Sequence, residues 1–240
     1  MARSYPPFDV AKPFGQDLWI MDGPEIRFLG VPFSTRATIV RLADGSLWFH
    51  SPIRWSAAAE QAVGGLGEVA HLIAPNWIHY AYLDGWKDRF PQAEVWAAPG
   101  VEARARKKGI PFPPAQDLGR ANPWAGEIET LFVAGSAVHR ECVFFHHASA
   151  TLILTDLIEN VEAGRVHWFV YWIAKVIGVA DPDGKMPADM AMSFRKGRAE
   201  LARAVQTMID WAPQRIVLAH GRCYEADAVA ELRRAFRKVL

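Results

Sequence analysis

Short apolar runs separated by turn signals fill the first fifty residues. The runs DLWIMD (17–22), IRFLGV (26–31) and ATIVRLADGSLWFHSP (37–52) are rich in β-branched and aromatic residues. In the third run, Asp44 and Gly45 stand between two alternating segments, which is a strong local signal for a β-hairpin. This pattern predicts a β-meander at the start of the chain.

The pattern changes to alternating helices and strands after Ser56. This serine precedes an Ala-rich segment that ends in glycines, which predicts a capped helix. The segment at 110–126 has four prolines and no regular period, so it is predicted to be a loop. Between them, the sequence predicts a strand over 68–74, a helix over 79–89, a strand over 93–99 and a helix over 100–109.

A second group of strands is followed by helices and a last β-α unit. In the segment 198–211, Leu201, Val205 and Met208 fall on one face at helical spacing. This order of elements implies two facing sheets with helices outside, so we predict a four-layer αββα sandwich of the α/β class. We expect residues 1–240 to form a single domain. The later strands are predicted over 128–135, 142–147, 151–156 and 215–221.

Charge and cysteine content exclude several classes of protein. The chain has 27 Lys and Arg against 26 Asp and Glu, so it has no overall field to attract nucleic acid or an anionic membrane. We interpret the basic clusters at 104–108 and 233–238 as solvated helix faces. Two cysteines without metal-binding spacing indicate neither a disulfide framework nor a zinc finger.

The sequence predicts a cytoplasmic protein without a transmembrane segment. The N-terminal residues lack the apolar core of a secretion signal. The apolar run at 166–180 contains His167 and Lys175 and is shorter than the ~20 residues that a spanning helix needs. We expect a small-molecule substrate or ligand and no nucleic-acid partner, and nothing in the sequence defines the oligomeric state.

Three ionisable residues stand at or just after the ends of predicted strands. His79 follows the strand VAHLIA, Asp156 closes TLILTD, and His220 closes RIVLA. In layered α/β proteins, chemistry collects where strands end, and a carboxylate in such a place needs a metal, a cation or donors. Each residue also has a structural interpretation: Asp156 as a helix cap, His79 in a first helical turn, and His220 in a tight turn.

These motifs and their order resemble the metallo-β-lactamase superfamily. The segments PNWIH, HRECVFFHHASATLILTDL and WAPQRIVLAHG carry the resemblance, which extends from about Asp17 to the C-terminal helix. They are similar to an uncharacterised branch known only as a domain of unknown function. The resemblance implies a metallo-β-lactamase-like αββα sandwich with a metal site at one edge.

The metal-binding turn of that superfamily, H-x-H-x-D-H, is largely absent from this chain. His79 matches the last histidine of the motif. Ala74, Asn76 and Ile78 stand where the other two histidines and the aspartate would be. The resemblance therefore implies a turn that keeps one of its four ligands.

The remaining ligand positions imply one metal ion instead of two. Asp156 matches the bridging aspartate and His220 the final histidine, while Ser51 stands in or near an early aspartate position. The first metal position would keep at most His139, which is too few ligands for zinc. The second would keep His79, Asp156 and His220, a set that suits one divalent ion: zinc, with iron or manganese as alternatives.

Four further residues are candidates for catalysis beside such an ion. Asn76 is a candidate donor to an oxyanion, and Tyr80, His139 and Glu141 are candidate proton groups. Glu141 as a surface strand residue and Tyr80 as a packing residue are the structural alternatives. The aromatic stretch at 166–175 is either a packing helix or an apolar wall for a hydrophobic substrate.

Three functions remain open from the sequence. The first is a mononuclear metal-dependent hydrolase of an ester, amide, lactone or phosphoester. The second is a catalytically inactive member of the fold, without metal, that binds a ligand or partner in the same cleft. The third is a mononuclear iron oxidoreductase, because two histidines and one carboxylate are also an iron ligand set.

Overall fold

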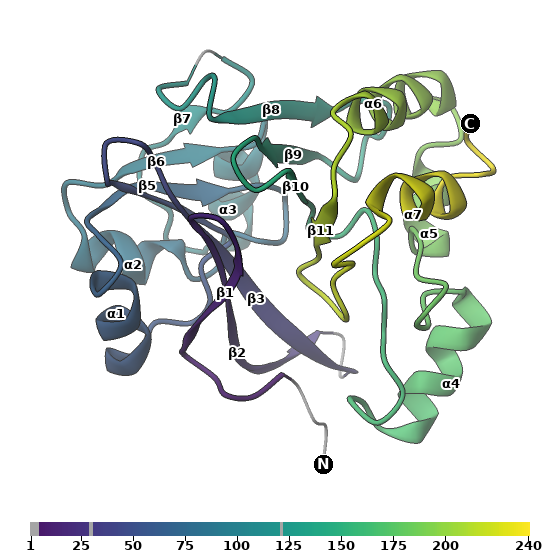
Figure 1. Cartoon of the computed structure of the whole chain (residues 1–240), viewed down its shortest axis with the longest axis horizontal. Helices are drawn as coiled ribbons and strands as arrows, with labels where there is room; N and C mark the ends of the chain where they lie inside the picture. Colours follow the sequence, from purple (N-terminus) through teal and green to yellow (C-terminus); the bar gives the residue numbers. More distant parts are fainter. Residues whose placement is uncertain (1–4, 29–30, 121) are drawn as a thin grey trace.

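Two β-sheets stacked on each other form the centre of the structure, and helices cover their outer faces (Figure 1). The computed structural model describes residues 5–28, 31–120 and 122–240. The predicted α/β class and the four-layer αββα arrangement are confirmed. No helix in these residues is long and apolar enough to cross a membrane.

The first sheet changes from antiparallel to parallel pairing halfway across. Neighbouring strands are antiparallel from β1 to β4 and parallel from β4 to β7. Parallel strands place their carboxyl ends at one edge of the sheet, which is where the turn after β5 begins. The strands, in spatial order, are β1 (Ala11–Gly15), β2 (Leu18–Phe28), β3 (Val31–Arg41), β4 (Leu47–His50), β5 (Val69–Ala74), β6 (Glu94–Ala97) and β7 (Gln116–Asp117).

The predicted meander is present, with one difference in its strands. Strands β3 and β4 form the expected hairpin, and Gly45 in its turn has a φ of 85°, which glycine adopts without strain. The predicted strands at 17–22 and 26–31 share one strand, β2, which continues through a register shift. Residues 29–30 of that second prediction lie outside the described residues.

The second sheet lies between the first sheet and two helices. Strand β9 is buried on both faces: Cys142 and Phe144 point into the core between the sheets, while Val143 points toward the helices. Leu201, Val205 and Met208 of α6 form the opposite wall of that second core, as their spacing predicts. The strands, in spatial order, are β11 (Arg215–Val217), β10 (Thr151–Ile153), β9 (Glu141–His146) and β8 (Ile128–Val133).

One predicted helix begins later than its pattern suggests. The helix expected over 79–89 starts at Leu83, because the side-chain carbonyl of Asn76 accepts the backbone N–H groups of Ile78 and His79 and holds a turn there. The helices are α1 (Ala57–Gly64), α2 (Leu83–Arg89), α3 (Val101–Lys108), α4 (Trp168–Ile177), α5 (Ala188–Ser193), α6 (Arg198–Asp210) and α7 (Ala228–Ala235).

A buried arginine ties the first sheet to the segment that follows β11. Arg36 on β3 is 4% exposed, and its guanidinium pairs with Asp22 at 2.8 Å. The same side chain donates to the carbonyl oxygens of Leu218 and Gly221, which flank His220. A single charged group therefore fixes the position of the β11 segment against the first sheet.

We predict that Arg36→Met lowers the free energy of unfolding by about 3 kcal/mol, because it leaves the buried Asp22 carboxylate short of a partner. Lys12 still reaches Asp22 at 2.8 Å, which keeps the loss at the lower end of that range. Arg41→Met is the matched control: Arg41 lies on the same strand and pairs with Asp17, but these side chains are 43% and 34% exposed. Its removal should cost no more than about 1 kcal/mol in urea unfolding followed by tryptophan fluorescence. If Arg36→Met lowered the free energy of unfolding no more than Arg41→Met does, the contacts of Arg36 would not be stabilising.

Candidate metal centre

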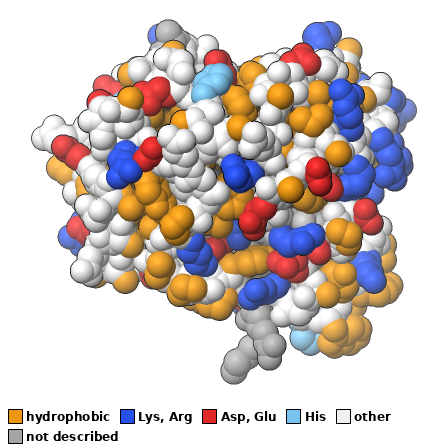
Figure 2. Space-filling view, in the orientation of Figure 1, with side chains coloured by type: hydrophobic (Ala, Val, Ile, Leu, Met, Phe, Trp, Pro, Cys, Tyr) orange, Lys and Arg blue, Asp and Glu red, His pale blue; other side chains and the backbone are white. Residues whose placement is uncertain are grey.

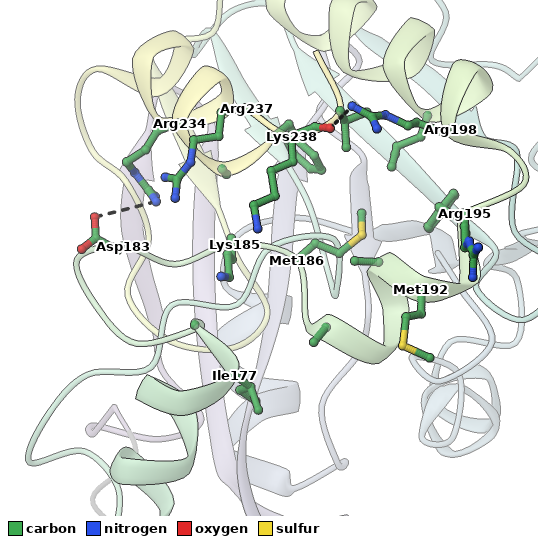
Figure 3. A pocket seen from close by; sticks show the side chains of 18 residues that line it. Ile177, Asp183, Lys185, Met186, Met192, Arg195, Arg198, Arg234, Arg237 and Lys238 are labelled. Carbon is green, nitrogen blue, oxygen red and sulfur yellow. Dashed lines mark hydrogen bonds and ion pairs between the residues drawn. The ribbon is translucent and has the colours of Figure 1, made fainter.

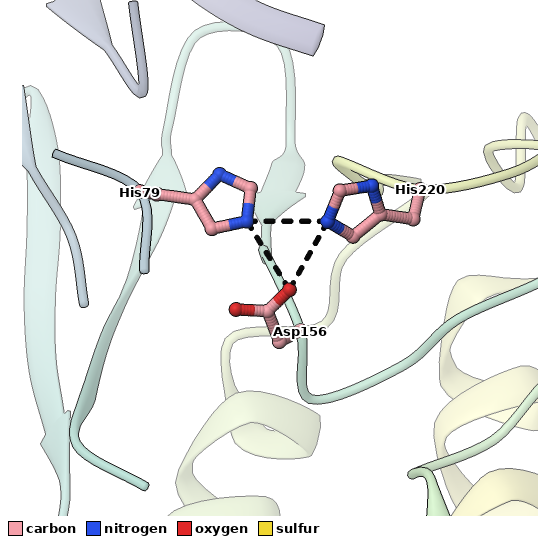
Figure 4. A group of neighbouring side chains, drawn as sticks. All are labelled: His79, Asp156 and His220. Atoms are coloured by element: carbon pink, nitrogen blue, oxygen red, sulfur yellow. Dashed lines mark hydrogen bonds and ion pairs between the residues drawn. The ribbon is translucent and has the colours of Figure 1, made fainter. Parts of the chain in front are cut away.

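Three predicted ligands converge at the edge where strands of both sheets end (Figure 4). His79 lies in the turn after β5, Asp156 follows β10, and His220 follows β11. The two histidines therefore approach from different sheets, with the carboxylate between them. All three side chains are shielded from solvent, with exposed fractions of 10% or less.

The three facing atoms form a nearly equilateral triangle. His79 Nε2 and His220 Nε2 lie 3.1 and 3.2 Å from Asp156 Oδ1, and the two nitrogens are 3.2 Å apart. In tetrahedral zinc sites with bonds of ~2.0–2.1 Å, neighbouring ligand atoms are separated by about 3.3 Å. The donor set and its spacing therefore fit one divalent ion with an open coordination position.

The outer nitrogen of each histidine has its own partner. His220 Nδ1 donates to the carbonyl oxygen of Ser34 at 2.8 Å, which leaves Nε2 with a lone pair in the neutral ring. His79 Nδ1 is hydrogen-bonded to Ser51 Oγ at 2.7 Å. Ser51 follows β4 with a φ of 51°, a strained value for a serine that indicates a constrained turn. Both rings are therefore oriented with Nε2 toward Asp156.

The charges in this cluster influence one another. Burial alone would raise the pKa of Asp156, but the two imidazoles hold it well below its usual range. Burial would lower the pKa of His220, but its hydrogen bond to Asp156 and the charge of that residue outweigh burial, and the pKa is raised. The carboxylate stays ionised, as a metal ligand must be.

Asn76 and Glu141 support Asp156 from the protein interior. The Asn76 amide donates to Asp156 Oδ2 at 2.6 Å and to Thr155 Oγ1 at 2.8 Å. Glu141 is fully buried, and it accepts the backbone N–H groups of Thr155 and Asp156. His139 Nε2 completes the network at 3.0 Å from Glu141 Oε2.

This network changes the interpretation of the catalytic candidates. Asn76 uses its donors within the protein, so no donor is left for an oxyanion, and Glu141 is a buried anchor instead of a surface strand residue. Asn76, His139 and Glu141 do not line the cleft in front of the metal centre, whereas Tyr80 does. The ring of Tyr80 also packs against Phe112, so the packing alternative describes part of its environment.

The cleft beside the metal centre is a mostly apolar cavity of about 360 Å³. Phe33 and Ile78 contribute apolar surface, and Glu159 and Asp189 are its acidic groups apart from Asp156. Burial raises the pKa of Glu159 to about 7. Ser34 on β3, Glu159 in the segment after β10 and Asp189 on α5 gave no signal in the sequence, because none of them lies in a motif with recognisable spacing.

Comparisons with known proteins agree with this geometry at the level of the fold. A family model described as a domain of unknown function, DUF4336, matches residues 16–183. A search of curated protein sequences found no match.

Solved structures of metallo-β-lactamases share the fold at low sequence identity. The metallo-β-lactamase DIM-1, exposed to ceftazidime, has a TM-score of 0.64 and 11% identity over 100% of both chains. FIM-1 from Pseudomonas aeruginosa, in its mono-zinc form, has a TM-score of 0.63 and 11% identity over 98% of this chain and 99% of that chain. The metal-soaked Flv1 flavodiiron core from Synechocystis has a TM-score of 0.60 and 12% identity over 95% of this chain and 60% of that chain. The chain therefore has a metallo-β-lactamase-like fold.

We predict that Glu141→Gln lowers the free energy of unfolding by at least about 2 kcal/mol, because hydrogen bonds to a charged group contribute about 1.5–3 kcal/mol each. The variant removes the negative charge that faces two backbone N–H groups and the His139 imidazole. Glu129→Gln is the matched control, since Glu129 also lies 3.0 Å from a histidine, His147, but both side chains are 45% exposed. Its loss should stay below about 1 kcal/mol in chemical unfolding.

The pair of His139 and Glu141 also predicts a pH dependence. Burial lowers the pKa of His139, but the hydrogen bond to Glu141 and its charge outweigh burial and raise that pKa above its usual 6.5. The added stability should therefore be fully present below pH 6.5 and lost as the pH rises through the raised value. NMR titration should show a raised pKa for His139, and that resonance should be absent from the spectrum of His139→Gln. A titration at or below 6.5 would contradict the proposed pairing.

Proposed function

The chain belongs to the DUF4336 family, and we propose that it is a mononuclear metal-dependent hydrolase of small molecules. The observation that carries this proposal is the triangle of His79, Asp156 and His220 beside an apolar cleft. The proposal treats residues 1–240 as one domain and the family as a branch of the metallo-β-lactamase superfamily. The metallo-β-lactamase-like fold supports both points.

Each residue of the centre has a separate task in this proposal. His79, Asp156 and His220 hold the ion, and Ser51 and Ser34 keep the two imidazoles in position. A bound zinc ion supplies Lewis acidity and lowers the pKa of water toward neutrality. Iron and manganese are the alternative ions for the same ligands.

Proton transfer is assigned to a group that lines the cleft. Tyr80 is placed there, whereas His139 and Glu141 lie behind Asp156 and act as positioning residues. Glu159 also lines the cleft, and its pKa of about 7 suits proton exchange near neutral pH. We propose Tyr80 and Glu159 as the proton groups.

The cleft favours an uncharged apolar substrate. Its walls are largely apolar, and Asp156, Glu159 and Asp189 add negative charge. Arg36 lines the same cavity, but its charge is already paired with Asp22. An uncharged ester, amide or lactone therefore fits better than a phosphoester, which would bring a further negative charge.

We predict that metal-free protein binds at most one equivalent of zinc tightly. Ala74 and Asn76 supply no imidazole for a second ion, and His139 faces Glu141 instead. Binding should weaken as the pH falls through the raised pKa of His220, because a protonated imidazole is not a ligand. Calorimetric titration with elemental analysis measures both effects. Two tight equivalents would contradict the single site, and none would favour an inactive binding module.

Asp156→Asn should remove most of the bound zinc while the fold survives, because it keeps the side-chain shape but removes the charge. Asp189→Asn is the control, since Asp189 lines the same cleft but belongs to no ligand group. Zinc retained by Asp156→Asn would exclude Asp156 as a ligand. Bound iron, with colour and oxygen uptake, would favour the oxidoreductase.

We predict that the zinc-loaded protein cleaves uncharged nitrophenyl esters and does not cleave bis(nitrophenyl) phosphate. Asp156→Asn should reduce kcat/KM for the esters by at least about 100-fold. Loss of a residue that only supports a ligand already lowers activity by up to about 100-fold, and Asp156 is proposed as a ligand itself. Asp189→Asn should retain the activity. Faster phosphodiester than ester cleavage would contradict the substrate class.

A further inference from the structure

Helix α4 exposes a row of large apolar side chains. Trp168 is 72% exposed, Phe169 49%, Trp172 57% and Val176 67%. These positions share one side of the helix, and the rings of Phe169 and Trp172 are stacked with centroids 6.1 Å apart. Figure 2 shows the hydrophobic side chains gathered over α4 at the lower right. We call Trp168, Phe169, Trp172 and Val176 the α4 patch.

The patch was not expected from the sequence. The sequence left the stretch at 166–175 as a packing helix or an apolar wall for a substrate, and Trp48, Trp86 and Trp124 are indeed fully buried. Trp168 and Trp172 are the two that the structure turns toward solvent. Single exposed apolar residues are common on protein surfaces. A contiguous apolar surface such as this one marks an interaction site.

A cationic cavity of about 700 Å³ begins at the C-terminal end of α4 (Figure 3). Ile177 lines it on the side of α4, and buried residues such as Phe194 and Phe236 form apolar wall. In Figure 3, Lys238 extends toward Lys185, and Arg237 lies beside Arg234. The cations that line the cavity are Lys185, Arg195, Arg198, Arg234, Arg237 and Lys238.

Most of this positive charge is not neutralised within the protein. Arg234 pairs with Glu231 and lies 3.9 Å from Asp183, the acidic residue that lines the cavity. Lys185, Arg195, Arg237 and Lys238 have no acidic partner in the described part of the chain. Although the whole chain has a net charge of only +1, this side of the molecule is locally basic. The basic cluster at 233–238 is therefore part of a cavity wall and not only a solvated helix face.

We propose that the α4 patch and the cationic cavity together dock the protein on an anionic phospholipid bilayer. Tryptophan and phenylalanine partition to the membrane interface, and basic residues beside them bind anionic headgroups. Helix α4 has ten residues and no acidic side chain, so it can lie in the interface but cannot span the bilayer. Apolar insertion and positive charge provide the two signals that stable peripheral binding needs.

A second copy of the chain is a poorer occupant of this surface. In a symmetric dimer the patch contacts the patch of the other copy, and α4 has no acidic side chain to pair with the cations beyond its C-terminal end. A bilayer with acidic headgroups neutralises them instead. Ile177 also lines the cleft beside the candidate metal centre, so the docking surface adjoins that cleft.

Flotation with lipid vesicles tests the proposal on the full chain. We expect binding to vesicles of phosphatidylcholine mixed with phosphatidylglycerol, and weak or no binding to phosphatidylcholine alone. The double variant Trp168→Ser with Trp172→Ser should lose binding to the mixed vesicles. Arg237→Ser with Lys238→Ser should reduce the partition coefficient roughly 25-fold, since each basic residue near an anionic surface contributes about fivefold.

Two control variants use residues outside the docking surface. Val10→Ser replaces a 43% exposed valine next to Asp9, which contacts the N-cap of α1. Lys107→Ser with Lys108→Ser removes two exposed charges from α3. Both should bind mixed vesicles as the parent chain does, and bromine-labelled lipids should quench the fluorescence of both.

The outcomes separate the possible occupants. No flotation of the parent chain, or undiminished flotation of the tryptophan variant, would overturn the proposal. A dimer in solution that the tryptophan variant abolishes, without vesicle binding, would identify a second copy as the occupant. Equal competition by inorganic phosphate would point to a soluble anion site in the cavity. Zinc content should be unchanged in every variant, so failure here leaves the proposed metal centre unaffected.

Discussion

One buried carboxylate at the junction of the two sheets governs the arrangement of the site. Asp156 is 4% exposed, and such a charge without partners would be unfavourable by several kcal/mol. One of its oxygens faces His79 and His220, the other accepts from Asn76, and its backbone N–H donates to Glu141. Asn76 and His79 follow β5, Glu141 begins β9, and His220 follows β11. Pairing the Asp156 carboxylate and its backbone N–H with these residues therefore fixes how the ends of the three strands meet.

The polar groups around Asp156 form two layers with different tasks. In front, two imidazoles leave a position that an ion can share with solvent and substrate. Behind, Asn76, which stands at a histidine position of the resembled motif, and Glu141 form hydrogen bonds within the protein. Protein contacts alone therefore hold the rear half of the candidate site.

Much of the architecture was predictable from local pattern. The hairpin at Asp44 and Gly45 and the helix capped by Ser56 depend on short-range chemistry, and the structure contains both. The meeting of His79 and His220 could be inferred only through the resemblance, because no local signal records which strand ends become neighbours. The burial of Glu141 and the exposure of the α4 aromatics are tertiary outcomes, so alternating or apolar pattern could not predict them.

The two histidines that face each other at 3.2 Å are 141 residues apart in the chain. During synthesis, His79 therefore leaves the ribosome long before its partner exists, and the early half of the protein has no complete set of ligands. Only a chain that has folded as far as β11 can retain an ion by all three residues. In the proposed hydrolase, metal capture is therefore a late step that reports completed folding, and truncated chains that lack His220 cannot hold the ion by all three residues.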